Sequence, residues 1–387
     1  MASQEHPGGR RIRLGMVGGG QGAFIGAVHR IASRLDDRFE LVAGALSSDP
    51  DRAAASAAEN GISADRSYTS YIEMAKAEAA RADGIEVVSI VTPNHLHASA
   101  AKAFLNAGIH VICDKPMTVS VSEAEELVEL VRSSGKLFIL THNYTAYPMI
   151  RQARAMVRDG AIGQLRVVKA EYAQDWLAEK AEETGVKQAE WRTDPERSGA
   201  GGAIGDIGTH AYNLAAFVTG ELPNELCAEL STFVEGRRLD DNVQILMRYE
   251  SGARGMLWAS QVAVGNENGL ALGIYGSRGG LEWSQEHPNH LWYAPFGEEK
   301  RLITRGGAGM GEDAGRFVRV PAGHPEGYLE GFANLYSEAA QALFAAREGK
   351  STPGGVIYPT VEDGLDGMKF IATSVESSKN GSVWTKL

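Results

Sequence analysis

The chain has 387 residues, of which 43% are hydrophobic and 22% charged, values that are ordinary for a globular protein with a large buried core. Its net charge of -11 disfavours a nucleic-acid partner, because no basic stripe in the sequence could neutralise phosphates. The longest apolar stretches have the length of strands, so we expect no membrane partner. Cys113 and Cys227 give neither a disulfide framework nor a zinc-ligand spacing, and we expect two buried thiols in a cytoplasmic protein.

The first part of the chain alternates between strands and helices. After residues 1–10, which we expect to be a disordered leader, the patterns predict strands at 12–17, 39–46, 86–91, 110–113 and 137–140, and helices at 26–35, 50–60, 96–106 and 120–132. Short strands separated by crossover helices indicate a parallel sheet with helices on both faces. The predicted fold class is therefore α/β, with an N-terminal Rossmann dinucleotide-binding domain over residues 11–145.

The pattern changes after about residue 145. A helix is predicted at 148–158, strands at 165–174, 226–234, 243–249, 254–262 and 270–275, and helices at 328–347 and 361–378. Apolar and polar side chains alternate from Val243 to Tyr249, which is typical of a sheet with one solvated face. We therefore expect residues 146–387 to form an α+β substrate and oligomerisation domain with a large, open, mostly antiparallel sheet. Packing of its last helix on the first domain stays open, and the glycine-rich stretch 306–315 is expected to be a mobile surface loop.

A glycine-rich segment follows the first strand. Residues 18–23, GGGQGA, match the G-x-G-x-x-A form of the dinucleotide fingerprint. Gly18 would permit the tight turn, Gly20 would let the backbone approach a pyrophosphate, and the following helix would supply amide donors and a partial positive charge. An ordinary strand-to-helix turn is the alternative. The predicted cofactor contacts in this segment are Gly18, Gly20, Gln21, Ala23, Phe24 and Ile25.

The end of the second strand bears on the choice between NAD and NADP. An acidic residue there would bind the adenosine ribose and favour NAD, but the expected position falls near Ser47. Arg52 lies one helical turn into the next helix, and a guanidinium beside a small hydroxyl suits a 2′-phosphate. Asp49 argues for NAD, and Arg52 is equally well explained as a solvated helix residue. The pattern slightly favours NADP.

Two polar groups are candidates for the chemistry. Lys115 follows a predicted strand at the carboxyl edge of the sheet, where its ammonium could stabilise a developing alkoxide, although a surface lysine is the ordinary alternative. Asp206 and His210 are four residues apart, which places them on one face if the helix begins that early. His210 suits proton transfer near neutrality, and Asp206 could orient its ring or bind a substrate hydroxyl. A helix-capping aspartate and a core histidine are the alternative.

Two other kinds of site are disfavoured. The pairs His95 with His97 and Asp206 with His210 come with no third ligand at a recognisable spacing, so we expect no metal. The sequence also lacks the G-x-S-x-G elbow of an α/β-hydrolase.

Taken together, these segments resemble the Gfo/Idh/MocA oxidoreductase family, which includes glucose-fructose oxidoreductase and inositol 2-dehydrogenase. The resemblance covers nearly the whole chain, in the family's order. It is carried by residues 18–20 (GGG), 26–29 (GAVH), 91–97 (VTPNHLH), 107–116 (AGIHVICDKP) and 202–210 (GAIGDIGTH).

The resemblance implies roles for individual residues. Lys115 would be the catalytic lysine of the family's Glu-Lys-Pro motif, His210 the proton donor or acceptor, and Asp206 its neighbour in the substrate site. The nicotinamide half of the cofactor would lie along Pro93, Asn94 and Asp114, and His97 and Lys115 are further predicted cofactor contacts. The family's substrates are sugars, polyols and their keto forms, and its members usually dimerise or tetramerise through the open face of the C-terminal sheet.

The chain departs from the family at several positions. The glycine loop is longer than usual between Gly20 and Gly26, and Asp114 replaces the common glutamate. Asn213 stands where many members have an aspartate, so the substrate stays open. Further residues that could line the substrate site are Tyr144, Trp176, Trp191, Arg192 and His324. The alternative is that these are ordinary core or interface residues.

We therefore predict an NAD(P)-dependent dehydrogenase that acts on a secondary hydroxyl of a sugar, polyol or glycoside, as a homodimer or homotetramer. One alternative is an enzyme that cycles a tightly held cofactor and so gives net cleavage or isomerisation. The other is a cofactor-binding sensor without turnover, because a fold does not fix a function. A pure sensor has no chemical need for Lys115, Asp206 and His210.

Overall fold

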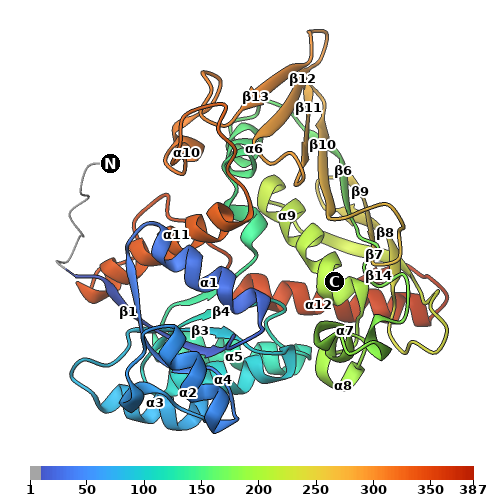
Figure 1. The fold of residues 1–387 in the computed structure, drawn as a ribbon. Helices are drawn as coiled ribbons and strands as arrows, with labels where there is room; N and C mark the ends of the chain where they lie inside the picture. The colour runs from blue at the N-terminus through green and yellow to red at the C-terminus, as the bar shows by residue number, and fades with distance from the viewer. Residues whose placement is uncertain (1–9) are drawn as a thin grey trace. The chain divides into compact units, whose positions relative to one another are not determined.

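The computed structural model describes residues 10–387. Residues 1–9 of the predicted leader therefore lie outside the described residues. The chain divides into two compact units (Figure 1). Of the described residues, the first unit contains 10–118, 122–143 and 328–365. The second unit contains 119–121, 144–327 and 366–387. The inclusion of residues 328–365 in the first unit differs from the sequence-based division at residue 145.

The first unit is built on a five-stranded parallel sheet. Its strands are β1 (Ile12–Gly18), β2 (Phe39–Ala45), β3 (Val87–Val91), β4 (His110–Cys113) and β5 (Phe138–Leu140). Its helices are α1 (Phe24–Leu35), α2 (Pro50–Glu59), α3 (Tyr71–Ala80), α4 (His97–Asn106), α5 (Val121–Ser134) and α11 (Tyr328–Arg347), with short 3-10 turns η1 (Ala64–Arg66) and η2 (Asn94–Leu96). Helix α3, which the hydrophobic pattern did not predict, is capped by the Ser70 side chain.

The strand order brings the candidate motifs to one edge. The order is β2-β1-β3-β4-β5, so the direction of winding reverses between β1 and β3. Gly18 at the end of β1 pairs with Val91, and Ile90 pairs with Cys113, so all three strands end together. In open α/β sheets, the carboxyl edge at such a reversal is where ligands bind.

Helix α11 belongs to the first unit because it packs on α1, on one face of the sheet (Figure 1). Inside this contact, His29 of α1, Ser89 of β3 and Tyr336 of α11 form a buried hydrogen-bonded triangle. The His29 Nδ1 to Tyr336 hydroxyl distance is 2.9 Å, and the Ser89 hydroxyl lies 3.1 and 3.0 Å from those two atoms. A buried polar network of this kind fixes one arrangement of its elements.

The second unit contains a nine-stranded sheet. Its strands are β6 (Leu165–Ala173), β7 (Pro223–Ser231), β8 (Asn242–Tyr249), β9 (Arg254–Ser260), β10 (Gly269–Gly276), β11 (Gly279–Ser284), β12 (His290–Pro295), β13 (Arg301–Thr304) and β14 (Thr385–Lys386). Its helices are α6 (Pro148–Arg158), α7 (Lys187–Arg192), α8 (Pro195–Ser198), α9 (Thr209–Thr219) and α10 (Glu312–Gly315), with η4 (Ala181–Glu183) and the π-helical turn η5 (Ile204–Gly208). Turn η3 (Asn143–Ala146) and helix α12 (Val361–Lys379) each contribute to both units.

The large sheet is mostly antiparallel, as predicted. Its order is β13-β12-β11-β10-β6-β9-β8-β7-β14, and of this sheet's pairings within residues 10–387 only that of β6 with β9 is parallel. Leu246 pairs with Met256, and their side chains are 52% and 46% exposed, so one face of the sheet carries apolar side chains that face solvent. Among the described helices, none is long and apolar enough to span a membrane. Cys113 is buried as expected, whereas Cys227 is only partly buried.

Candidate functional site

The glycine-rich segment after β1 makes a tight turn into α1. Gly18 and Gly19 have φ angles of 77° and 71°, in the left-handed region that favours glycine. A Cβ on Gly26 would lie 2.4 Å from the Cα of Gly19, so strand and helix approach each other without side chains between them. The sequence motif ended at Ala23, but the glycine that gives the close helix packing is Gly26.

Gly20, which is predicted to let the backbone approach a pyrophosphate, is also tightly packed. A Cβ there would lie 2.6 Å from the Leu46 carbonyl oxygen and 2.8 Å from the Ser56 hydroxyl, so this glycine packs the turn against the loop after β2. Beyond it, α1 begins at Phe24 with no side-chain cap from Ala23 and no acidic residue in the first turn. An N-terminus of this kind is suited to an anion, because its first amides point along the helix dipole.

The loop after β2 lies beside this turn. The Arg52 Nη2 donates to the Gln21 carbonyl oxygen at 3.3 Å, and the Gln21 amide donates to the Ser56 hydroxyl at 3.1 Å. Asp49 caps α2, because its carboxylate accepts from the Arg52 amide at 2.8 Å. Ser47, where an acid was expected, accepts from the Asp49 amide at 3.1 Å. The predicted pair of Ser47 and Arg52 is thus brought to the same end of the sheet as the glycine turn.

The segment after β3 holds Pro93 and Asn94, of which Asn94 is buried. His97 is also buried, and both of its ring nitrogens face backbone carbonyl oxygens, Nδ1 that of Pro116 at 2.7 Å and Nε2 that of Thr92 at 2.8 Å. Burial lowers the pKa of His97, a shift that the charge of Asp114 opposes. His97 therefore ties the loop after β3 to the loop after β4, and its direct contact with the cofactor stays a prediction.

Lys115 follows β4, and its position is set by Asp114. The Asp114 Oδ1 accepts from the Lys115 amide at 3.1 Å and from the Thr141 hydroxyl at 2.7 Å, at the end of the neighbouring strand β5. The Lys115–Pro116 peptide bond is cis. His142 is buried next to this group, and its pKa falls to about 3, because of burial first and the charge of Lys115 second. The neighbourhood of Lys115 therefore contains a neutral imidazole and one carboxylate.

In the second unit, Asp206 and His210 lie on consecutive turns of one helical segment, η5 followed by α9. The Asp206 Oδ2 accepts from the Arg192 Nε at 3.1 Å and from the Gln261 Nε2 at 2.9 Å. His210 is buried, and its ring packs edge-on against the Tyr144 ring with centroids 4.8 Å apart. π-Helical turns occur frequently at functional sites, and this one carries the predicted aspartate.

A chain of hydrogen bonds leads away from Tyr144. Its hydroxyl lies 2.7 Å from the Tyr172 hydroxyl, which donates to the Asn268 Oδ1 at 2.7 Å. The same oxygen accepts from the Gln174 Nε2 at 2.8 Å, and the Trp176 Nε1 donates to the Gln174 Oε1 at 3.1 Å. Burial raises the pKa of Tyr144, so it stays a neutral hydroxyl.

Arg192 joins the predicted aromatic residues to Asp206. Its guanidinium lies 4.2 Å from the Trp191 ring centroid and 5.9 Å from that of Trp176. Trp176 is 36% exposed, so its ring offers a face to a ligand. Asn213 lies one turn beyond His210 on α9, and its buried Oδ1 has no hydrogen-bond partner. A buried acceptor without a partner is costly unless a ligand donates to it.

His324 lies apart from this group. It is exposed and lines a cavity of about 550 Å³ with His287, His290 and the buried ion pair of Arg305 with Glu326. Its place in the substrate lining stays a prediction.

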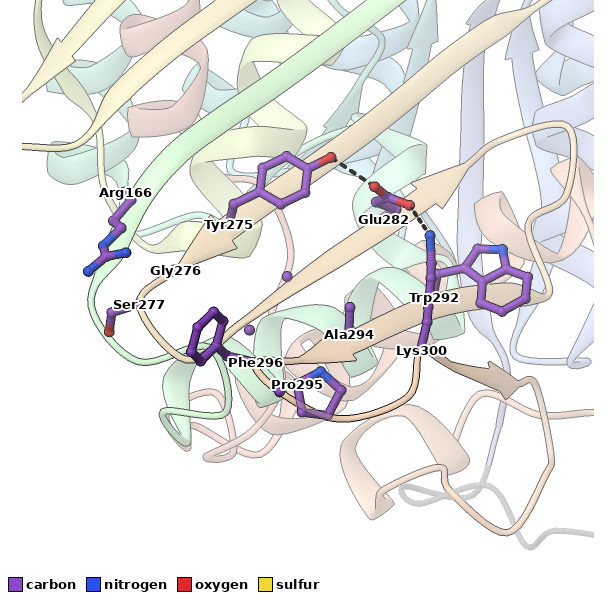
Figure 2. Close-up of a pocket in the computed structure, with 13 residues that line it drawn as sticks. Arg166, Tyr275, Gly276, Ser277, Glu282, Trp292, Ala294, Pro295, Phe296 and Lys300 are labelled. Carbon is purple, nitrogen blue, oxygen red and sulfur yellow. Dashed lines mark hydrogen bonds and ion pairs between the residues drawn. The ribbon is translucent and has the colours of Figure 1, made fainter.

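A second cavity lies on the large sheet, away from every predicted site residue. It measures about 490 Å³ and is lined by residues of β6, β10, β11 and β12 and of the loop after β12 (Figure 2). Figure 2 shows Tyr275 and Lys300 directed at Glu282 from opposite sides, with the hydroxyl 3.0 Å from Oε1 and the ammonium 2.5 Å from Oε2. Phe296, at the cavity's mouth, is 86% exposed.

Among residues 10–387, no group of three or more histidine, cysteine or acidic side chains could hold a metal ion. Sequence reasoning missed Thr141, Gln261 and Asn268, which hold predicted residues by side-chain hydrogen bonds. None of them has a local motif that could have revealed it, because nonlocal strand pairing brings them to the site.

Two family models match the chain. Residues 12–142 match the oxidoreductase family with an NAD-binding Rossmann fold, and residues 150–282 match the GFO/IDH/MocA C-terminal domain.

Relatives of known structure or activity match across most of their length. The crystal structure of an oxidoreductase from Sinorhizobium meliloti is 55% identical, with a TM-score of 0.88 over 97% of this chain and 100% of that one. An inositol dehydrogenase homologue from Azotobacter vinelandii, solved with NADH and myo-inositol, is 35% identical, with a TM-score of 0.91 over 98% of each chain. A levoglucosan dehydrogenase from Pseudarthrobacter phenanthrenivorans is 29% identical over 74% of this chain and 76% of the relative.

Proposed function

The chain belongs to the Gfo/Idh/MocA family of oxidoreductases, and from this premise we propose that it transfers hydride between a nicotinamide dinucleotide and a secondary hydroxyl or ketone of a sugar, polyol or glycoside. The observation that carries the proposal is the placement of Asp114 and Lys115 on the same sheet edge as the glycine turn. The relatives solved with myo-inositol and named for levoglucosan support the substrate class.

The first unit fits the cofactor. The close approach of Gly19 and Gly26 leaves no room for a larger side chain at either position, and the start of α1, which has no side-chain cap, is suited to the pyrophosphate. The residues that would hold the cofactor are Gly18, Gly20, Gln21, Ala23, Phe24, Ile25, Ser47, Arg52, Pro93, Asn94, Asp114 and Lys115. When bound, the dinucleotide supplies the hydride acceptor or donor.

The protein's part is to move a proton and to stabilise charge. In the oxidative direction, His210 accepts the hydroxyl proton, and the Lys115 ammonium stabilises the alkoxide as it forms. Asp206, which Arg192 and Gln261 hold, would orient the His210 ring or bind a substrate hydroxyl. Tyr144, Trp176, Trp191, Arg192 and Asn213 would orient the substrate, and the Asn213 Oδ1 would accept a hydrogen bond from one of its hydroxyl groups.

The cofactor preference rests on Arg52. Asp49 is engaged as the cap of α2, which leaves Ser47 and the Arg52 guanidinium to meet the adenosine ribose, an arrangement that suits a 2′-phosphate. We expect kcat/KM to be higher with NADP than with NAD, and Arg52→Ala to lower the value for NADP alone. A strong preference for NAD, the form bound by the Azotobacter vinelandii relative, would overturn this part of the proposal.

The proposed reaction is tested by the absorbance of reduced nicotinamide, using purified protein, both cofactors and a panel of inositols, aldoses, sugar acids and glycosides. A signal with one class of compound supports a dehydrogenase. Silence across the panel with the dinucleotide bound would contradict it. Substrate consumption detected by mass would then indicate internal redox cycling, and no consumption would indicate a sensor.

The open face of the large sheet is proposed as the surface for a homodimer or homotetramer. Leu246, Met256 and Trp292 expose apolar surface there, and the cavity of Figure 2 adds the ring of Phe296. Met256→Lys should lower the molar mass measured by sedimentation. Ile72→Lys, at a similarly exposed apolar residue of α3 in the first unit, should leave it unchanged. An unchanged mass for Met256→Lys would contradict this surface.

A further inference from the structure

A buried carboxylate anchors the start of the helical segment that carries Asp206 and His210. Asp240 lies in the loop before β8, and its Oδ1 accepts from the Gly202 amide at 2.6 Å while Oδ2 accepts from the Ile204 amide at 2.9 Å. Its backbone oxygen accepts from the Ala203 amide at 2.8 Å. Three consecutive amides at this helix start are therefore bonded to one residue that is 36 to 38 positions away in sequence.

The helical segment has no cap of its own at this end. Ala203, which precedes η5, makes no side-chain capping bond, and the first amides of a helix have no partner within it. Gly202 is needed for the contact, because a Cβ there would lie 2.1 Å from the Asp240 carbonyl oxygen. The glycines before the Asp-x-x-x-His motif thus have a packing reason that the sequence alone did not reveal.

The backbone position of Gly202 determines where the candidate catalytic side chains lie. The Asp206 amide donates to the Gly202 carbonyl oxygen at 2.9 Å, so the residue that Asp240 holds also begins the hydrogen-bond ladder of the turn. His210 follows one turn later on α9. A shift of Gly202 or Ile204 would therefore move both side chains together.

We propose that Asp240 is a positioning residue, which acts through the backbone of Gly202–Ile204 to hold Asp206 and His210 in register for proton transfer. The inference rests on the proposed function, in which His210 exchanges the substrate proton. Asp240 does not itself take part in the chemistry in this account.

The neighbouring Asp241 provides a matched control. It too is buried, and its carboxylate oxygens accept from the amides of Phe233 and Val234 at 2.9 to 3.1 Å and pair with Arg237. Asp241 therefore anchors a different loop with the same chemistry. Burial raises the pKa of Asp240 to about 6, with the charge of Asp241 adding to the shift. Both carboxylates are buried and hydrogen-bonded to backbone amides, so replacing either one should affect stability.

The test compares Asp240→Asn with Asp241→Asn in the full chain, with the substrate and dinucleotide found active in the panel. Asparagine keeps one side-chain oxygen that can accept a hydrogen bond, but its NH₂ group replaces the other. That NH₂ group and the backbone amide facing it are both donors, so one hydrogen bond is lost. We expect Asp240→Asn to lower kcat by about 10- to 100-fold, the effect of a displacement of about 1 Å, with KM for the dinucleotide within about twofold of wild type. Asp241→Asn should lower the melting temperature while kcat stays within about threefold, since its loop carries no reacting group.

A purely structural role predicts other results. A kcat for Asp240→Asn within about threefold of wild type, or an equal loss of kcat in Asp241→Asn, overturns the inference. If Asp240→Asn does not fold, Gly202→Ala probes the same contact from the helix side and should reproduce the fall in kcat without a change in KM for the dinucleotide.

His210→Ala in the same assay separates this inference from the proposed function. If His210→Ala is inactive and Asp240→Asn is as active as wild type, the positioning role is wrong and the function stands. If His210→Ala retains wild-type turnover, the proton-transfer role of His210 and the positioning role of Asp240 are both overturned, while the dehydrogenase activity stands.

Discussion

Neighbouring side chains fix the backbone position of Lys115. Asp114 accepts from the lysine amide and from Thr141, so one carboxylate fixes the loop that presents the ammonium to the sheet edge. His97 ties the same loop to the segment after β3. The side chains that support Lys115 thus come from the segments that follow three neighbouring strands, β3, β4 and β5. Parallel sheets commonly place ligand-binding residues at this carboxyl edge.

Thr141→Val tests this support. The change keeps the shape of the side chain and removes its 2.7 Å hydrogen bond to Asp114, so we expect about 1 kcal/mol less stability and a kcat about three- to tenfold lower. Thr219→Val is the control, because that hydroxyl bonds within α9 to the Ala215 carbonyl oxygen. The account would be contradicted if steady-state kinetics gave both variants the same kcat.

At the level of elements, the sequence was most informative where structure is local. The parallel strands could be predicted because each is a short apolar run, and β3 is buried along its whole length. Parallel topology then brings Gly18, Asn94 and Lys115 to one edge without further information. Strands β11 to β13 were missed because their composition is mixed, although each pairs with the strand next to it in sequence.

The same limit applies to the site. The Asp-x-x-x-His spacing predicted Asp206 and His210 on consecutive turns, but Gln261 and Asp240 reach them from other parts of the sheet. No local signal marks α11 as part of the first unit, because its contact with α1 depends on side chains more than 300 positions apart. The glycine-rich stretch 306–315, expected to be a loop, ends in the short helix α10.

The turn from β1 into α1 gives a prediction at this scale. Gly26→Ala would place a Cβ 2.4 Å from the Gly19 backbone, so we expect clearly lower stability and weaker dinucleotide binding. Gly22→Ala is the matched control: it has a φ of 78° but open space around it, so it should cost only about 1 kcal/mol of backbone strain. Melting temperature and the dinucleotide Kd measure both effects. Equal values for the two variants would show that the close packing at Gly26 is unimportant.

For the whole molecule, buried histidines make stability depend on pH. Burial lowers the pKa of His29 to about 4 and that of His142 to about 3, so the unfolded chain binds protons at these residues before the folded one does. Their contribution is present above pH 6.5 and is lost as pH falls toward 4. Asp240 acts in the opposite direction, because its raised pKa stabilises the folded state as pH falls through about 6.

The combined effect of His29 and His142 on stability exceeds the opposite effect of Asp240, so the free energy of unfolding should fall by a few kcal/mol between pH 7 and pH 5. Each histidine contributes about 2 kcal/mol to this fall. Denaturant titrations at the two values measure the change. His29→Gln keeps an acceptor for Tyr336 but does not titrate, and it should remove about 2 kcal/mol of the difference. A stability that stays constant or rises toward pH 5 would be inconsistent with neutral buried imidazoles.

The central claim is that Lys115 stabilises charge on the substrate oxygen during hydride transfer. The most direct measurement is the single-turnover rate of nicotinamide reduction in Lys115→Ala, alongside the dinucleotide Kd. The control is Lys136→Ala, at a lysine in the loop between α5 and β5, before the strand rather than after it. The account predicts a rate lower by about 10²- to 10³-fold in Lys115→Ala, with the Kd changed little and the control unaffected. A near-normal rate in Lys115→Ala would contradict it.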